Sequence, residues 1–281
     1  MNATLSGRIQ FDHTALAAPE KAPILALLRE LFGGAIVWDD RTGLEAQGFR
    51  AGQLDLSGTV IEVIEPAGEA SFLHPYLAKR GPGLHHITFK VAELDRFLAD
   101  QAARGVAFTG VERDRQGRTV NAFTRPGSSY GMLIQFRPRE AWSREALRHH
   151  PSLRDLPPPL PSRARLAATA VAAADGAATL AYLQGLLGGE LGPRTGQNEH
   201  LAQSLRVGGT ELTIFWPAEP GPALHHLTLE ITDWDETLTA VRRLGLPLRA
   251  GEHEAFVDAA NPTGAQFHLR RIPASRIERQ R

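Results

Sequence analysis

The sequence predicts an α+β protein that contains two copies of one unit. GPGLHHITFKVAELD at 81–95 returns as GPALHHLTLEITDWD at 221–235, and GTVIEVIEP at 58–66 returns as GTELTIFWP at 209–217. In both copies the apolar spacing switches in the same order between the alternation typical of strands and the three-to-four-residue spacing typical of helices. Each copy is therefore predicted to contain the order strand, helix and three strands two times in succession.

The first copy begins with a predicted strand at 7–17 and a helix at 19–31, which Gly33 and Gly34 end. Three short strands follow, before a second strand at 84–91 and a second helix at 94–104. Apolar residues recur at helical spacing in that second helix, so it covers one face of a sheet and leaves the other face open. We expect the open face to curve into a cup.

The second copy repeats this order. Strands are predicted at 163–173 and 224–231, and helices at 176–187 and 236–244. Between the copies, proline and charged residues replace the regular apolar pattern. We therefore predict a first unit at 1–137, a Pro-rich linker at 138–162, a second unit at 163–272 and a tail at 273–281.

Composition narrows the classes of function. Thirty-one basic residues balance 31 acidic ones, so no net charge draws the 281-residue chain to nucleic acid or to a membrane surface. The chain has no cysteine, so a metal site must use histidine nitrogen with carboxylate or amide oxygen. The first residues lack the apolar core of a signal peptide, and we expect a cytoplasmic protein.

Alternation along three predicted strands of the first copy places polar side chains on one face. Glu62 points away from its apolar neighbours, His86 shares its side with Thr88 and Lys90, and Gln135 stands between Ile134 and Phe136. His13 adds a fourth polar group from the first strand. His85 and His225 face the apolar side, where structural roles are expected.

The phrases FDHTAL, IEVIEPAGEASFLHPYLAKRGPGLHHITFKV and YGMLIQF resemble the vicinal oxygen chelate superfamily, which includes glyoxalases, bleomycin resistance proteins and extradiol dioxygenases. The resemblance is greatest to the branch of methylmalonyl-CoA epimerase-like and glyoxalase-like proteins. It covers residues 8–137 and, as a fold pattern, 164–271. It implies tandem units, each of two βαβββ modules that form a curved mixed sheet, a cup with helices outside.

The resemblance also implies one divalent metal ion, without distinguishing Mn, Co, Ni, Zn and Fe. Its ligands would be His13, Glu62, His86 and Gln135, with Glu62 and Gln135 in catalytic positions. The terminal ligand of relatives is a carboxylate that often acts as a base, and the amide of Gln135 cannot take a proton at neutral pH.

Three further residues are candidate substrate contacts. Lys90 is predicted either to meet an anionic substrate group or to form a salt bridge at the rim of the cup. Arg118 and Asn121 lie in the polar stretch DRQGRTVNAF, where substrate contact and plain solvation are both open.

The second copy carries Ala168, Thr213, His226 and His268 at the four ligand positions. Two imidazoles without a carboxylate hold a hard cation poorly. We therefore expect a degenerate second unit, one functional metal site per chain within 8–137, and a monomer or homodimer.

Three functions remain open. The first is a metal-dependent isomerase or lyase that acts on a small oxygenated substrate through a metal-stabilised enolate or chelation of vicinal oxygens. The second is a non-haem Fe(II) dioxygenase, ring-cleaving or related, in which His13, His86 and Glu62 form the facial triad. The third is a metal-free protein that sequesters a ligand, as bleomycin resistance proteins do.

Overall fold

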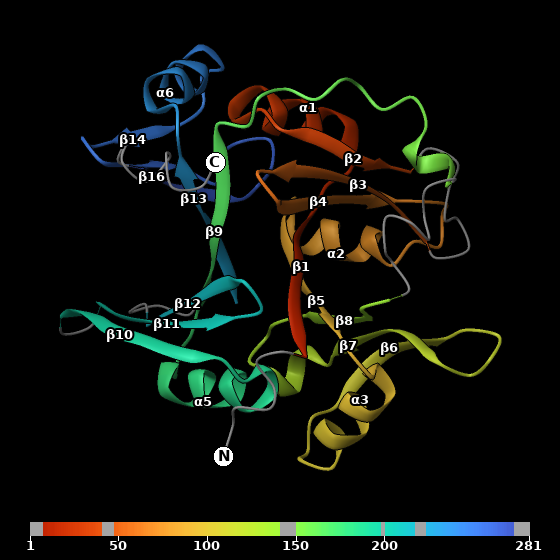
Figure 1. The fold of residues 1–281 in the computed structure, drawn as a ribbon. Coiled ribbons are helices and arrows are strands. Elements are labelled where there is room, and N and C mark those ends of the chain that lie inside the picture. The colour runs from red at the N-terminus through yellow and green to blue at the C-terminus, as the bar shows by residue number, and fades with distance from the viewer. Residues whose placement is uncertain (1–7, 41–47, 141–149, 198–199, 217–222, 273–281) are drawn as a thin grey trace. The chain divides into compact units, whose positions relative to one another are not determined.

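The computed structural model of the chain describes residues 8–40, 48–140, 150–197, 200–216 and 223–272. Their fold is α+β, with two mixed eight-stranded sheets and five α-helices (Figure 1). The strand order is β2-β3-β4-β1-β5-β8-β7-β6 in the first sheet and β10-β11-β12-β9-β13-β16-β15-β14 in the second. The two orders correspond strand by strand, which confirms the predicted tandem fold.

The first sheet and its helices occupy residues 9–138. Their bounds are β1 (Ile9–Ala17), α1 (Lys21–Phe32), β2 (Ala35–Asp39), β3 (Phe49–Leu56), β4 (Thr59–Pro66), α2 (Leu73–Arg80), β5 (Gly83–Val91), α3 (Leu94–Ala102), β6 (Phe108–Arg113), β7 (Thr119–Thr124) and β8 (Ile134–Pro138).

The second sheet and its helices occupy residues 164–271. Their bounds are β9 (Ala164–Ala172), α5 (Gly176–Leu187), β10 (Glu190–Gln197), β11 (His200–Val207), β12 (Thr210–Trp216), β13 (Leu224–Ile231), α6 (Trp234–Arg243), β14 (Leu248–Ala250), β15 (Glu254–Val257) and β16 (Gln266–Arg271).

The long helices end where glycine allows the chain to turn. Gly33 has φ 70° and its N–H donates to the Arg29 carbonyl at 2.8 Å, while Gly188 has φ 73° and donates to Gln184 at 2.9 Å. At its other end α5 is capped by the Asp175 side chain, which accepts from the Ala178 N–H. All four helices predicted from periodicity are confirmed, within about two residues at each end.

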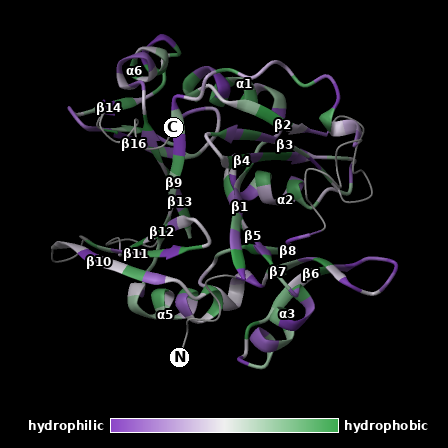
Figure 2. Cartoon of the chain, viewed as in Figure 1, coloured by the Kyte–Doolittle hydropathy of each residue, from purple (hydrophilic) through white to green (hydrophobic). Residues whose placement is uncertain are grey.

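The shorter helices α3 and α6 are amphipathic, and both show hydrophilic and hydrophobic colours in Figure 2. Leu94, Phe97 and Leu98 of α3 are buried, as their spacing predicts. No helix in the described part of the chain is long and apolar enough to cross a membrane.

Backbone contacts divide the chain into two compact units, each assembled from separate stretches of sequence. One consists of Met1–His13, His86–Arg148 and Ala168–His225; within it the Phe11 N–H donates to the Gly208 carbonyl at 2.8 Å. The other consists of Thr14–His85, His149–Ala167 and His226–Arg281; within it the Leu166 N–H donates to Thr59 Oγ1 at 2.9 Å. Each unit therefore combines stretches from both halves of the sequence.

The domain boundaries at 137, 162 and 272 stay a prediction. Residues 141–149 of the predicted linker and the predicted tail at 273–281 lie outside the described residues.

His85 packs on the apolar side of β5, as alternation predicts. Its ring meets the ring of Tyr76 on α2 edge-on, with centroids 4.7 Å apart. Burial lowers the pKa of His85 to about 4, although the nearby Glu62 carboxylate acts in the opposite direction. In the second sheet, burial likewise lowers the pKa of His225, whose ring lies 4.9 Å from that of Phe215.

This lowered pKa makes the protein less stable in acid. Well above pH 6.5 His85 is neutral in both states, but as the pH falls through 6.5 towards 4 the unfolded chain binds a proton that the folded chain resists. Between about pH 7.5 and about pH 5, His85 is expected to remove at most about 2 kcal/mol from the free energy of unfolding. In urea unfolding, the free energy of unfolding of His85→Gln should fall less between these two pH values than that of the wild type. The control His253→Gln, at an exposed site, should lose as much as the wild type. Equal losses for His85→Gln and the wild type would contradict this account.

Candidate metal centre

Three neighbouring strands of the first sheet carry the candidate ligands. β4, β1 and β5 are adjacent in the strand order, and they hold Glu62, His13 and His86. Because side chains alternate along a strand, one residue from each strand can face the same side at the same level. Ile61 and Val63, on either side of Glu62, are fully buried.

His13, Glu62 and His86 come together. Each offers one ligand atom, and these atoms all lie within 4.8 Å of one another. The three side chains are buried, with 0%, 5% and 4% of their surface exposed, and the two imidazole rings meet edge-on at 5.6 Å. Within the described ranges, no other His, Cys, Asp and Glu residues form such a group.

The donor set suits a divalent transition metal. Two imidazole nitrogens and one carboxylate oxygen are ligands for zinc, iron and their neighbours, and three protein ligands leave positions open for substrate. Burying a carboxylate is costly unless charge or hydrogen bonds compensate it. Gln53, opposite Glu62 on β3, donates one such bond from Nε2 to Glu62 Oε1 at 2.9 Å. The residues therefore fit a metal.

Gln135 joins a chain of hydrogen bonds that leads to His13. Its Oε1 accepts from Thr88 Oγ1 at 2.6 Å, and its Nε2 donates to Asn121 Oδ1 at 2.8 Å. Thr88 Oγ1 also lies 2.9 Å from His13 Nε2. The sequence predicts Gln135 and Asn121 as candidate site residues, whereas it places Thr88, the residue that links them to His13, on the face of His86 without a role. Its place two residues after His86, on the same face of β5, was the available signal.

Asp12 supports His13 from the other side. Its Oδ2 lies 3.1 Å from His13 Nδ1, and its Oδ1 pairs with Lys90 Nζ at 2.6 Å. Burial alone would raise the pKa of Asp12, but hydrogen bonds and charges of His13 and Lys90 outweigh it and hold the pKa well below its usual range. Lys90 thus forms the salt bridge that was one of its two predicted roles. Sequence reasoning missed Asp12.

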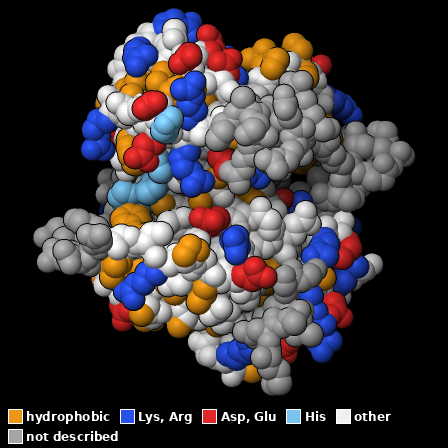
Figure 3. Space-filling model, turned by 60° about the vertical axis from the view of Figure 1, so that its left-hand side comes forward, with side chains coloured by type: hydrophobic (Ala, Val, Ile, Leu, Met, Phe, Trp, Pro, Cys, Tyr) orange, Lys and Arg blue, Asp and Glu red, His pale blue; other side chains and the backbone are white. Residues whose placement is uncertain are grey.

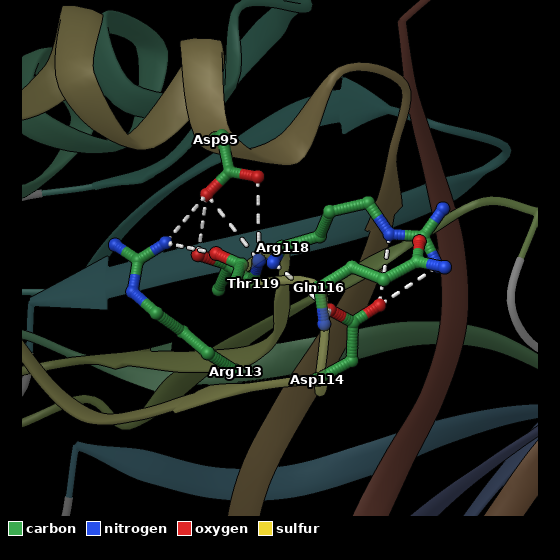
Figure 4. A network of polar contacts seen from close by, with 7 residues as sticks. Asp95, Arg113, Asp114, Gln116, Arg118 and Thr119 are labelled. Atoms are coloured by element: carbon green, nitrogen blue, oxygen red, sulfur yellow. Dashed lines mark hydrogen bonds and ion pairs between the residues drawn. The ribbon is translucent and has the colours of Figure 1, made fainter.

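Arg118 lies in the exposed turn between β6 and β7 (Figure 4). Its Nε donates to Asp114 Oδ2 at 2.8 Å, and 69% of its side chain is exposed. Asp95 binds the same turn through Thr119 and Arg113. The structure therefore brings Asn121 to Gln135 and places Arg118 in a surface network.

The equivalent positions of the second sheet have a different chemistry. His226 stands at the position of His86 and His268 at that of Gln135, and their rings meet edge-on with centroids 6.0 Å apart. His268 is committed elsewhere: its Nε2 lies 3.1 Å from Glu254 Oε2, and its ring stacks on Phe256 at 4.4 Å. Burial lowers the pKa of His268. On the face of the molecule seen in Figure 3, histidine side chains reach the surface beside acidic and basic ones.

Comparison with protein families gives a match within the first half of the chain. Residues 12–122 match the model of the Glyoxalase/Bleomycin resistance protein/Dioxygenase superfamily. These residues form a domain of that superfamily. The superfamily domain includes His13, Glu62 and His86, whereas Gln135 lies beyond the matched residues. Comparison with curated protein sequences gave no match.

Two solved structures with the same fold match nearly the whole chain, and a third structure matches half of it with a lower score. A mutant of 4-hydroxymandelate synthase from Streptomyces coelicolor has a TM-score of 0.61 at 13% identity, over 96% of both chains. A fusion of a xylose isomerase-like TIM barrel with 4-hydroxyphenylpyruvate dioxygenase has a TM-score of 0.66 at 14% identity, over 98% of this chain and 50% of the fusion. Methylmalonyl-CoA epimerase from Mycobacterium tuberculosis has a TM-score of 0.42 at 22% identity, over 49% of this chain and 91% of the epimerase.

Thr88 offers a test of the hydrogen-bonded chain. Thr88→Val keeps the shape but removes the donor to the buried amide oxygen of Gln135, so the free energy of unfolding is expected to fall by about 1–3 kcal/mol. The control is Thr228→Val at the equivalent position of the second sheet, which should cost less because His268 stands there in place of Gln135. Urea unfolding measures both, and equal effects would contradict the role given to Thr88.

Proposed function

We propose that the chain is a divalent-metal-dependent enzyme that acts on a small oxygenated substrate. The observation that carries this proposal is the convergence of His13, Glu62 and His86, three buried ligands in a superfamily domain. A bound cation supplies Lewis-acid chemistry, which polarises neighbouring oxygens of a substrate. Because the protein supplies three ligands, such a cation would keep coordination positions for substrate oxygens.

The three ligands would make different contributions to a bound metal. The imidazoles of His13 and His86 supply neutral nitrogen donors, while Glu62 supplies the one negative charge of the set. Gln53 holds Oε1 of Glu62, which limits the rotation of the carboxylate. The buried surroundings keep bulk water from these groups, so electrostatic interactions with a substrate are stronger there than in water.

Gln135 restricts the reaction. As an amide it cannot act as the base that a terminal carboxylate would provide, and both its polar ends have protein partners. We assign to Gln135 the role of positioning Thr88, while Asn121 holds the amide of Gln135 in turn. Of the two candidate catalytic residues, Glu62 is the one to which we assign the transfer of a proton. An isomerase or lyase built on this site would have Glu62 as the one carboxylate of its ligand set.

A dioxygenase is the second candidate. Two histidines and one carboxylate are the ligand set of the facial triad in non-haem Fe(II) oxygenases, and His13, His86 and Glu62 supply that set. A metal-free ligand-binding protein is the third function and is an outcome of the tests below.

Metal analysis tests the site first. We expect one equivalent of metal per chain after loading with Zn²⁺ or Co²⁺. A large loss of affinity is expected in Glu62→Gln, which removes the only negative charge of the ligand set, and in His86→Ala, which removes one of three ligands. The matched control is His226→Ala in the second sheet, which should bind like the wild type. Binding of about two ions per chain, or a loss with His226→Ala but not with His86→Ala, would overturn the single-site assignment.

Isotope exchange and oxygen uptake separate the reaction types. The protein is loaded anaerobically with Fe(II), Mn(II) or Co(II) and offered 2-oxo acids and catechols in deuterated water. An isomerase or lyase should place deuterium in a substrate without consuming oxygen, and Glu62→Gln should abolish the exchange. Oxygen uptake by the Fe(II) form would favour the dioxygenase. Ligand binding that survives alanine at both His13 and His86 would favour the metal-free function.

A further inference from the structure

We propose that Asp12, held in place by Lys90, is a positioning residue that fixes a hydrogen on Nδ1 of His13 and so presents Nε2 as the metal ligand. The inference rests on the proposed function for its metal, but its structural part concerns three residues whose contacts are all observed. It gives a role to the ion pair of Asp12 and Lys90, neither of which belongs to the ligand set.

The three residues form a short relay across two adjacent strands. Asp12 and His13 are neighbours on β1, and Lys90 lies on β5 beside it in the sheet. Lys90 Nζ lies 2.6 Å from Oδ1 of Asp12, which leaves Oδ2 to meet His13 Nδ1 at 3.1 Å. The His13 side chain is 1% exposed, against 18% for Asp12 and 22% for Lys90. The relay therefore runs from the partly exposed ammonium to the buried imidazole.

The partner of each ring nitrogen decides which one can bind a metal. A carboxylate paired with an ammonium accepts hydrogen bonds and donates none, so the nitrogen that faces it must carry the hydrogen. A neutral imidazole has one N–H and one lone pair. With the hydrogen fixed on Nδ1, the lone pair of His13 is on Nε2. A histidine ligand oriented by a carboxylate in this way binds its metal more tightly.

The hydroxyl of Thr88 is compatible with either tautomer of His13. It donates its one proton to Gln135 Oε1 at 2.6 Å, and its oxygen lies 2.9 Å from His13 Nε2, where the roles of donor and acceptor depend on the tautomer. The contact of Asp12 with Nδ1 therefore carries the assignment. With the hydrogen on Nδ1, Nε2 has the lone pair that a metal would use, and the Thr88 proton stays with Gln135.

The second copy shows what happens where this ligand is missing. Ala167 and Ala168 stand at the positions of Asp12 and His13, and Glu230 stands at that of Lys90. Glu230 pairs with Arg165 at 2.7 Å, so the charge of this position is reversed. The carboxylate, the ligand and the lysine are therefore present together in one copy and absent together from the other.

Asp12→Asn tests the proposal with a nearly isosteric change. Zn²⁺ affinity, measured by competition with a chromophoric chelator, is expected to fall about 10- to 100-fold. In the metal-free protein, ¹⁵N–¹H spectra of the histidine side chains should show His13 protonated on Nδ1 in the wild type and as a mixture of both tautomers in the variant. The control is Asp114→Asn, which removes a surface carboxylate paired with Arg118 and should change neither readout.

The proposal is overturned if Asp12→Asn leaves the Zn²⁺ affinity unchanged, or if His13 of the wild type is protonated on Nε2 alone. It is also overturned if Asp12→Asn lowers the Zn²⁺ affinity only as much as it lowers the free energy of unfolding, with no change in the tautomer of His13. If Asp12→Asn fails to fold, Lys90→Gln takes its place, with a smaller loss of affinity and a partial change of tautomer expected. Absence of Zn²⁺ binding in the wild type would defeat the proposed function, while the tautomer spectra would still decide the role of Asp12.

Discussion

The buried carboxylate of Glu62 is the constraint on which the first sheet depends. A charged group at a site 5% exposed is tolerated when opposite charge or strong hydrogen bonds surround it. Here the amide of Gln53 donates one hydrogen bond, and a cation held together with His13 and His86 would supply the opposite charge. The arrangement needs β4, β1 and β5 in one register. A slip of one residue would turn Glu62 to the opposite face, so the ligand set and the strand pairing require each other.

The two sheets show that this fold does not need the ligand set. They share one strand order, yet Ala168 and Thr213 replace the first two ligands in the second sheet, and His268 is held by Glu254 and Phe256. Apolar residues such as Leu212 and Ile214 still bury the core face of that sheet. Fold and chemistry are thus separable in one chain, as expected when a site is built upon a scaffold that is stable without it.

Much of the fold and part of the site followed from the sequence. Periodicity and the internal repeat predicted the helices and the tandem sheets because both are local patterns, and alternation placed Glu62, His86 and Gln135 on one face. The Asp12–Lys90 pair and the link through Thr88 depend on which residues of neighbouring strands lie opposite each other, which a local pattern does not contain. Arg118 and Asn121 are close in sequence, but shifts of register between β6 and β7 and the turn beyond them give these residues different surroundings.

Anomalous diffraction from crystals grown with Zn²⁺ or Co²⁺ tests the central claim most directly. The account predicts one strong anomalous peak per chain, with His13 Nε2, a nitrogen of His86 and a carboxylate oxygen of Glu62 each at about 2.0–2.2 Å from the ion. No peak at the first sheet in a metal-loaded crystal, or a peak bound by His226 and His268 alone, would contradict it.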